Sequence, residues 1–177
     1  MMAVVKMNYL TRGTKALQTL RQAARYYTFR NGPDQAARLW HTSDGRVTGY
    51  STVQAEITAA MQASAYTYRI VISAKDADLT AAGYHVVLAG QFDRYYLIEH
   101  HNTAMPHAHV IGFRKELVSK AEVQAIRVRA QRVERARAQE QHVLRAQLSG
   151  RGGEILAQTR PQLEHERDRG IDGPGGE

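Results

Sequence analysis

The 177-residue sequence contains no cysteine. This absence excludes a disulfide-stapled scaffold, a Cys-ligated zinc site, an iron–sulfur cluster and a thiol nucleophile. No apolar run approaches the roughly 18 residues that a transmembrane helix needs, and the N-terminus shows no signal-peptide pattern. From sequence we therefore expect a soluble, cytoplasmic protein with no membrane partner, whose metal sites, if any, use histidine and carboxylate ligands.

Acidic residues are also scarce, since 17 Asp and Glu face 24 Lys and Arg, and the net charge is +7. The excess is uneven: residues 1–60 carry +5, residues 61–115 carry +1, residues 116–149 carry +3 and residues 150–177 carry −2. Such a distribution suits a polyanion such as nucleic acid, whose binding depends largely on phosphate neutralisation. Many basic proteins bind no nucleic acid, so charge alone does not decide the function.

Local patterns predict a mixed α and β chain. The best strand signal is the β-branched and aromatic run Tyr-Thr-Tyr-Arg-Ile-Val-Ile-Ser at 66–73. Two further strand-like segments, 94–100 and 107–114, should form an antiparallel hairpin. The other predicted elements are an opening strand within 3–10, helices over 15–29, 51–64 and 79–92, and a turn at 43–45.

One long charged helix is predicted over 116–148, with a possible cap at Ser119 and sparse apolar positions. Its arginines could bind DNA or a partner helix, although interleaved glutamates could equally form intrahelical pairs with them. The segment Ser149-Gly150-Arg151-Gly152-Gly153 should end the helix, and we expect 150–177 to be disordered. The arginines concerned are Arg127, Arg129, Arg132, Arg135 and Arg137.

Four of the eight histidines lie between positions 100 and 109. His107 and His109 are two residues apart on a predicted strand, so their imidazoles should point to one face. A hairpin can bring His100 onto that face, whereas His101 should point away. Three neutral imidazoles would form a facial site for a divalent cation with positions open to substrate. The alternative is that these histidines face solvent or hydrogen-bond within the sheet.

Tyr26 and Tyr27 end the first predicted helix between Arg25 and Arg30. A tyrosine hydroxyl has a pKa of about 10 and is a poor nucleophile unaided. A metal ion that polarises a phosphodiester can make its attack feasible. The alternative is ordinary packing for Tyr27, which shares a helix face with leucines, and partial exposure for Tyr26.

These residues carry a resemblance. The order is a helix with tyrosines, then the Tyr-Arg-Ile-Val-Ile-Ser strand, then His-x-Asn-x-x-x-Pro-His-Ala-His-Val-Ile. Over residues 1–120 this resembles the HUH-endonuclease relaxases of plasmid and integrative-element mobilisation, in the class with a His-x-Asp-x-x-x-x-His-x-His signature. The match places His100 at the first histidine and His107 and His109 at the last two, with the spacing reproduced.

The resemblance implies an α/β (α+β) fold in which an antiparallel sheet carries the metal site and helices pack behind it, here followed by the long charged helix. It implies three parts: a nuclease domain at 1–118, a basic helix at 119–149 and a tail at 150–177. The implied reaction is attack of a tyrosine on single-stranded DNA at an origin-like site. It leaves a 5′-phosphotyrosine link and a free 3′-OH that later rejoins the ends.

The implied cofactor is Mg²⁺ or Mn²⁺, held by His100, His107 and His109, with Asn102 and Glu99 supporting the ligands. Both tyrosines fit the nucleophile position, and helix-face geometry favours Tyr27. Accessory mobilisation proteins are further expected partners. The basic residues expected along the DNA backbone are Arg12, Lys15, Arg21, Arg25, Arg30 and Arg69.

The sequence departs from the family at Asn102, where an aspartate is usual, and at Met105, where a further histidine is often found. The amide removes a carboxylate that could orient a histidine or assist the tyrosine's proton. Two other interpretations therefore stay open. One is the same chemistry in rolling-circle replication or single-strand transposition, and the other is a non-catalytic DNA-binding accessory protein with a relaxase-like fold.

Overall fold

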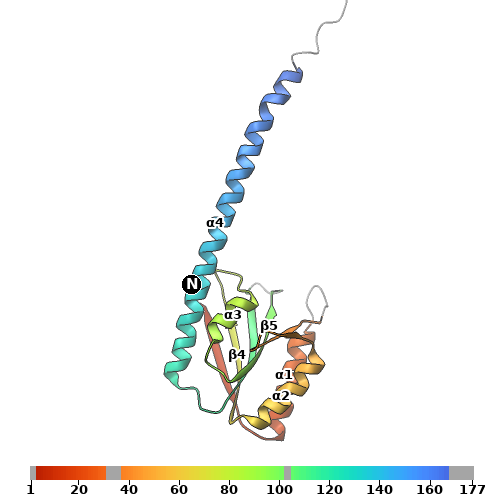
Figure 1. Ribbon diagram of the computed structural model, residues 1–177, viewed down its shortest axis with the longest axis vertical. Coiled ribbons are helices and arrows are strands. Elements are labelled where there is room, and N and C mark those ends of the chain that lie inside the picture. The colour runs from red at the N-terminus through yellow and green to blue at the C-terminus, as the bar shows by residue number, and fades with distance from the viewer. Residues whose placement is uncertain (1–2, 31–36, 102–104, 168–177) are drawn as a thin grey trace, which may run out of the picture. The chain divides into compact units, whose positions relative to one another are not determined.

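The computed structural model describes the backbone of residues 3–30, 37–101 and 105–167, and side chains as far as residue 149. Its elements are a mixture of helices and antiparallel strands, as the sequence predicts (Figure 1). They are β1 (Val4–Leu10), α1 (Thr14–Phe29), β2 (Trp40–Thr42), β3 (Val47–Thr48), α2 (Tyr50–Ala63), β4 (Tyr66–Ser73), α3 (Ala81–Leu88), β5 (Arg94–His100), β6 (His107–Arg114) and α4 (Lys120–Arg167).

The six strands form one sheet in the order β1-β4-β6-β5-β2-β3, and each neighbouring pair is antiparallel. The α+β fold with an antiparallel sheet is therefore confirmed, as are the bounds predicted for β4, β5 and β6. The short β2–β3 hairpin was not predicted. Its strands of three and two residues are too short to show a hydrophobic period, although the turn at Ser43-Asp44-Gly45 was recognised.

Each face of the sheet is covered by a pair of helices (Figure 1). Helices α1 and α2 cover one face, and α3 with the beginning of α4 covers the other. Because side chains alternate along a strand, β6 contributes Ile111 and Phe113 to the α1–α2 side and Ala108 and Val110 to the opposite side. The sheet is thus buried on both faces, and polar residues on it need an explanation.

Two helix ends differ from the prediction because glycine sets them. The residue before α1 is Gly13 with φ of 119°, so the helix begins at Thr14, one residue before the predicted start. Helix α3 ends at Leu88, four residues before the predicted end, and Gly90 follows with φ of 69°. Both conformations lie in the left-handed region that favours glycine.

Helix α4 is anchored in the core, whereas the sequence suggested a mostly solvated or partner-bound helix. Ile126 and Ala130 are fully buried, and Glu134 is only 2% exposed. The Glu134 carboxylate accepts hydrogen bonds from the backbone N–H groups of Lys75 (2.6 Å) and Asp76 (3.0 Å). The first compact unit therefore extends to Ala138, beyond the expected boundary at 118, and the second unit comprises Gln139–Glu177.

Helix α4 also continues beyond its predicted end at 149–153 and finishes at Arg167. Glycine costs about 1 kcal/mol relative to alanine in a helix, which lowers helix propensity without forbidding it. The flanking segments are rich in Ala, Gln, Leu, Arg and Glu, which favour the helix. The expected disordered tail thus differs from the structure over 150–167, and 168–177 lie outside the described residues.

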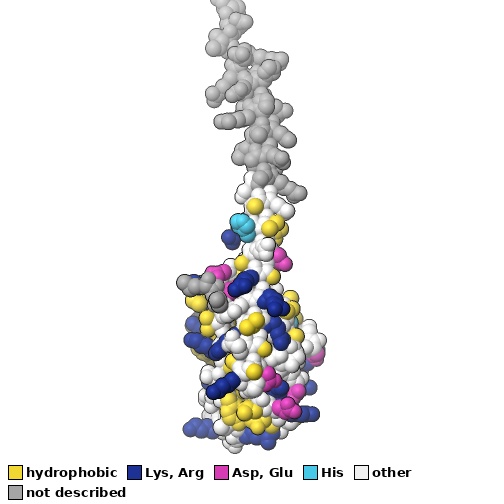
Figure 2. All heavy atoms as spheres, turned by 90° about the vertical axis from the view of Figure 1, so that its left-hand side faces the viewer, with side chains coloured by type: hydrophobic (Ala, Val, Ile, Leu, Met, Phe, Trp, Pro, Cys, Tyr) yellow, Lys and Arg dark blue, Asp and Glu magenta, His cyan; other side chains and the backbone are white. Residues whose placement is uncertain are grey.

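Basic and hydrophobic side chains are interspersed on the face that carries the beginning of α4 (Figure 2). One of the arginines suggested for DNA or partner binding has a different role, since the Arg129 guanidinium donates to the backbone carbonyls of Val87 (3.4 Å) and Ala89 (2.6 Å) at the end of α3. Within the described part of the chain, no helix combines the length and the apolar character needed to cross a bilayer.

Candidate metal site and adjacent tyrosine

Three histidines converge where β5 and β6 are joined. His100 lies opposite His107 in the register of these strands, and His109 lies opposite Ile98. The ring centroids of His100 and His107 are 5.2 Å apart, and each ring is 4.9 Å from that of His109. One ligand nitrogen from each ring lies within 4.8 Å of the other two, so the triad can hold a metal ion.

Hydrogen bonds to backbone carbonyls fix the tautomers of two ligands. A carbonyl oxygen only accepts, so His100 Nε2 must donate to the Tyr27 carbonyl (2.9 Å) and His107 Nδ1 to the Met105 carbonyl (3.0 Å). The lone pairs available to a cation are then Nδ1 of His100 and Nε2 of His107. A ligand histidine that donates its other N–H to a carbonyl is the usual arrangement in metal sites.

Both nitrogens of His109 and Nδ1 of His100 are buried without a hydrogen-bond partner among the described residues. Burial, followed by the charge of Arg38, lowers the pKa of His100 to about 4. Burial, followed by repulsion from His100, lowers the pKa of His109 to about 3. Both imidazoles are therefore neutral at physiological pH, which is the form that binds metal. Buried lone pairs with no other partner fit a cation well.

The C-terminal end of α1 is held against the triad. The indole N–H of Trp40 donates to the Thr28 hydroxyl (2.9 Å), which donates to the Ala24 carbonyl (2.8 Å). All three residues are buried. This anchor places the last carbonyls of α1, including that of Tyr27, beside His100. The C-terminal end of a helix carries partial negative charge, which favours a cation at this position.

The two candidate tyrosines are placed differently. The ring of Tyr27 is 9% exposed and stacks on His109, with centroids 3.8 Å apart and planes 9° from parallel. Tyr26 is 54% exposed, and the Arg30 guanidinium lies 5.7 Å from its ring centroid. Tyr27 is therefore the tyrosine that belongs to the site, in agreement with the helix-face argument from sequence.

Arginines surround the triad and Tyr27. Burial raises the pKa of the Tyr27 hydroxyl, and the charge of Arg69, together with a hydrogen bond from it, lowers that pKa in part. Arg30 acts electrostatically on both His100 and His109, so it also lies near the triad. Arg38, which was not predicted, lies close enough to His100 to lower its pKa. An imidazole cluster with nearby guanidinium groups provides a setting for a phosphodiester anion.

The other predicted DNA-binding residues are spread along α1 and the residues just before it. Arg12 and Lys15 are at the beginning of α1, roughly 20 Å along the helix from Tyr27. The guanidinium of Arg12 donates to the Ser64 carbonyl, and that of Arg21 donates to the Thr58 hydroxyl (3.2 and 3.3 Å). Arg25 is exposed two residues before Tyr27.

The expected support of the ligands by Glu99 is not found. Glu99 precedes His100 on β5, so its carboxylate lies on the opposite face of the sheet. There its oxygens are 3.5 Å from His41 Nε2 and 3.6 Å from His101 Nε2. His101 also points away from the triad, as predicted, and contacts Asp78 at 2.8 Å. Asn102 lies outside the described residues.

Comparisons with protein-family models, with curated proteins and with solved structures find no match to this chain.

Proposed function

We propose that this protein is a metal-dependent, tyrosine-based nuclease that nicks and rejoins single-stranded DNA, as the relaxases of plasmid or integrative-element mobilisation do. The observation that carries the proposal is the stacking of Tyr27 on His109. It puts a phenol hydroxyl, a cluster of imidazoles and the Arg69 guanidinium at one place. The motif resemblance, over residues 100–109, agrees with this placement.

The chain's own groups have distinct parts in the reaction. The Tyr27 hydroxyl oxygen attacks the phosphorus, so an O–P bond forms to tyrosine while the bond from phosphorus to the 3′ oxygen breaks. The phenol loses a proton, the departing 3′ oxygen gains one, and the 5′ phosphate stays on Tyr27. Attack by a 3′-OH on this phosphotyrosine reverses the step and rejoins the strand.

Arg69 donates to the tyrosine hydroxyl and stabilises negative charge on its oxygen as the proton leaves. Backbone carbonyls hold His100 and His107 in the tautomers that accept a cation. When bound to the three histidines, Mg²⁺ or Mn²⁺ would polarise the phosphodiester and neutralise its developing charge. Histidine ligands bind softer metals more tightly, so Mn²⁺ is the better probe of the site.

The proposal is tested by incubating the protein and Mn²⁺ with tiled single-stranded oligonucleotides from its own genetic neighbourhood. A covalent protein–DNA adduct should then appear on a denaturing gel. Tyr27→Phe should abolish the adduct, and Tyr26→Phe, its exposed neighbour, is the matched control that should retain it. His107→Ala/His109→Ala should lose both Mn²⁺ binding and adduct.

Absence of an adduct across the whole tiled set, or an adduct that persists in Tyr27→Phe, would contradict the proposal. DNA binding without an adduct would instead favour the non-catalytic accessory protein. An adduct at a replication origin or a transposon end, and not at a transfer origin, would assign the same chemistry to replication or transposition.

A further inference from the structure

A cavity lies on the same side of the sheet as the triad. Its volume is about 210 Å³, below the roughly 300–1,000 Å³ of sites that enclose drug-sized ligands. Tyr96 and His100 are four residues apart on one face of β5, so this cavity and the triad are about 13 Å apart along the strand. The lining residues that matter are Thr42, Asp44, Arg46, Glu56, Arg94 and Tyr96.

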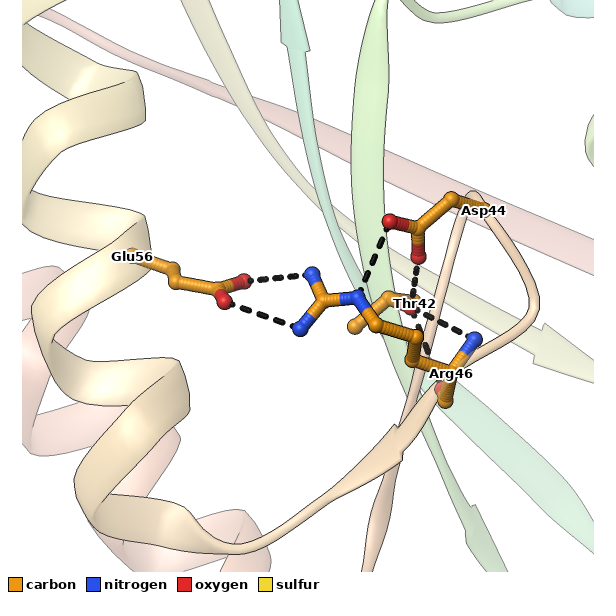
Figure 3. Close-up of polar contacts among 4 residues, drawn as sticks. All are labelled: Thr42, Asp44, Arg46 and Glu56. Atoms are coloured by element: carbon orange, nitrogen blue, oxygen red, sulfur yellow. Dashed lines mark hydrogen bonds and ion pairs between the residues drawn. The ribbon is translucent and has the colours of Figure 1, made fainter.

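Arg46 lines this cavity and is held by polar contacts with Glu56 and Asp44, which Figure 3 shows. Its guanidinium donates to both oxygens of Glu56 on α2 (3.1 and 3.3 Å) and to Asp44 in the β2–β3 turn (3.0 Å). The Thr42 hydroxyl bonds to Asp44 and accepts from the Arg46 backbone N–H (3.0 Å). The hydrogen bond from Thr42, followed by that from Arg46, lowers the pKa of Asp44 to about 2. Two carboxylates thus compensate the charge of Arg46.

Tyr96 and Arg94 leave hydrogen-bonding capacity facing the cavity. Tyr96 is 1% exposed, and its buried hydroxyl makes no well-oriented hydrogen bond among the described residues, although Glu56 and Arg94 both lie close enough to interact with it. Burial and then the nearby Glu56 carboxylate raise its pKa to about 12, while Arg94 acts in the opposite direction. Arg94 itself is exposed, so the cavity reaches solvent. A donor cation, a carboxylate and a phenol hydroxyl therefore line one small space.

This lining suits a neutral planar group better than a phosphate. The carboxylates of Asp44 and Glu56 offset the charges of Arg46 and Arg94, so the cavity offers no net attraction to an anion. Unpaired bases are recognised by hydrogen bonds along their edges, with arginine donating to a carbonyl oxygen or a ring nitrogen and carboxylates accepting from amino groups. Guanine and cytosine carry both an amino group and a carbonyl, whereas adenine lacks the carbonyl and thymine lacks the amino group.

We propose that the cavity beside Tyr96 is a subsite for one unpaired guanine or cytosine of a single-stranded DNA whose backbone passes the histidine triad. The proposal rests on the proposed DNA substrate, and it adds base selectivity at a fixed place. Arg94 and Tyr96 donate to the base carbonyl, and Glu56 accepts from its amino group. Because Glu56 is already bonded to Arg46, the acceptor is held in place before the base enters.

The test measures binding, not nicking. Fluorescence anisotropy measures the affinity for a labelled thymine-only oligonucleotide and for versions that carry one C, G or A at each position in turn. All measurements use the Tyr27→Phe background, EDTA and one fixed salt concentration. One position should show about tenfold tighter binding for C or G than for T or A. Arg94→Ala and the conservative Tyr96→Phe should each remove most of that preference, measured as the ratio of the C or G affinity to the thymine-only affinity of the same variant.

Arg145→Ala is the matched control, since it removes an exposed arginine from α4 and should retain the full preference. Circular dichroism and a urea midpoint verify that each variant is folded. The proposal is overturned if no position prefers C or G, or if the preference survives in both Arg94→Ala and Tyr96→Phe. A base preference without any adduct would leave the subsite standing and remove the nuclease proposal, and an adduct without base preference would do the reverse.

Discussion

Burial of two imidazoles in the triad predicts a specific loss of stability in acid for the metal-free protein. Burial, then Arg38, lowers the pKa of His100 from 6.5 to about 4, and burial, then His100, lowers that of His109 from 6.5 to about 3. Below about pH 6.5 the unfolded chain takes up protons at these residues while the folded chain does not. Stability is therefore complete above this pH and declines as the pH falls toward 4 and 3.

The magnitude follows from the size of these shifts. At about pH 5 each imidazole is almost fully protonated in the unfolded chain and almost neutral in the folded one, which corresponds to about 2 kcal/mol per histidine. Both together give about 4 kcal/mol, a large fraction of the roughly 5–15 kcal/mol that stabilises a typical domain. The loss should be visible as a fall in the urea midpoint.

The assay compares urea unfolding at about pH 7.5 and about pH 5, with EDTA, for the natural protein and the His100→Gln/His109→Gln variant. Glutamine keeps an N–H for the Tyr27 carbonyl but does not titrate in this range, and all other titrating groups are common to both proteins. The natural protein should lose about 4 kcal/mol more than the variant between the two pH values. An equal loss in both would refute buried neutral imidazoles. Mn²⁺ at the higher pH should raise the midpoint of the natural protein only.

Two packing predictions concern the sheet and α4. Gly112→Ala should lower the free energy of unfolding by about 1–3 kcal/mol, because a Cβ at this position of β6 would lie 2.7 Å from the Phe92 ring. Phe92→Leu in the same chain should recover part of that loss, and an unchanged urea midpoint for Gly112→Ala would show that the contact is wrong. Glu134→Ala should cost a similar 1–3 kcal/mol, because it removes the acceptor for the backbone N–H groups of Lys75 and Asp76. Glu134→Gln, which keeps a carbonyl acceptor, should lose less in the same measurement.

The parts of the site that were predictable from sequence depend on local spacing. The His-x-His pair lies within a run of β-branched and aromatic residues, so both its strand and its shared face could be inferred. A hairpin between 94–100 and 107–114 then brings His100 beside the His-x-His pair. In the register of β5 and β6, His100 lies opposite His107. The same alternation puts Glu99 on the opposite face, so its expected role beside the ligands conflicted with information already in the sequence.

What could not be predicted depends on contacts between residues that are distant along the chain. Arg38 lies near His100 because the Trp40 indole anchors β2 to Thr28 on α1, and nothing in the local sequence reports this contact. Likewise, α4 has few apolar positions, yet Ile126 and Ala130 are fully buried. Sparse apolar residues thus sufficed to attach a highly charged helix to the core, because they meet a sheet face that is already apolar.

The position of the triad on the sheet explains why its imidazoles are suited to metal. Along one face of β6 the sequence reads His107, His109, Ile111 and Phe113, so the histidines continue an apolar row. An imidazole in water keeps its ordinary pKa of about 6.5, and burial lowers that pKa. Here Tyr27 covers His109 and the last turn of α1 covers His100, so burial dominates the pKa of both. The covering that keeps these ligands neutral thus also brings the tyrosine to them, which couples metal affinity to the placement of the proposed nucleophile.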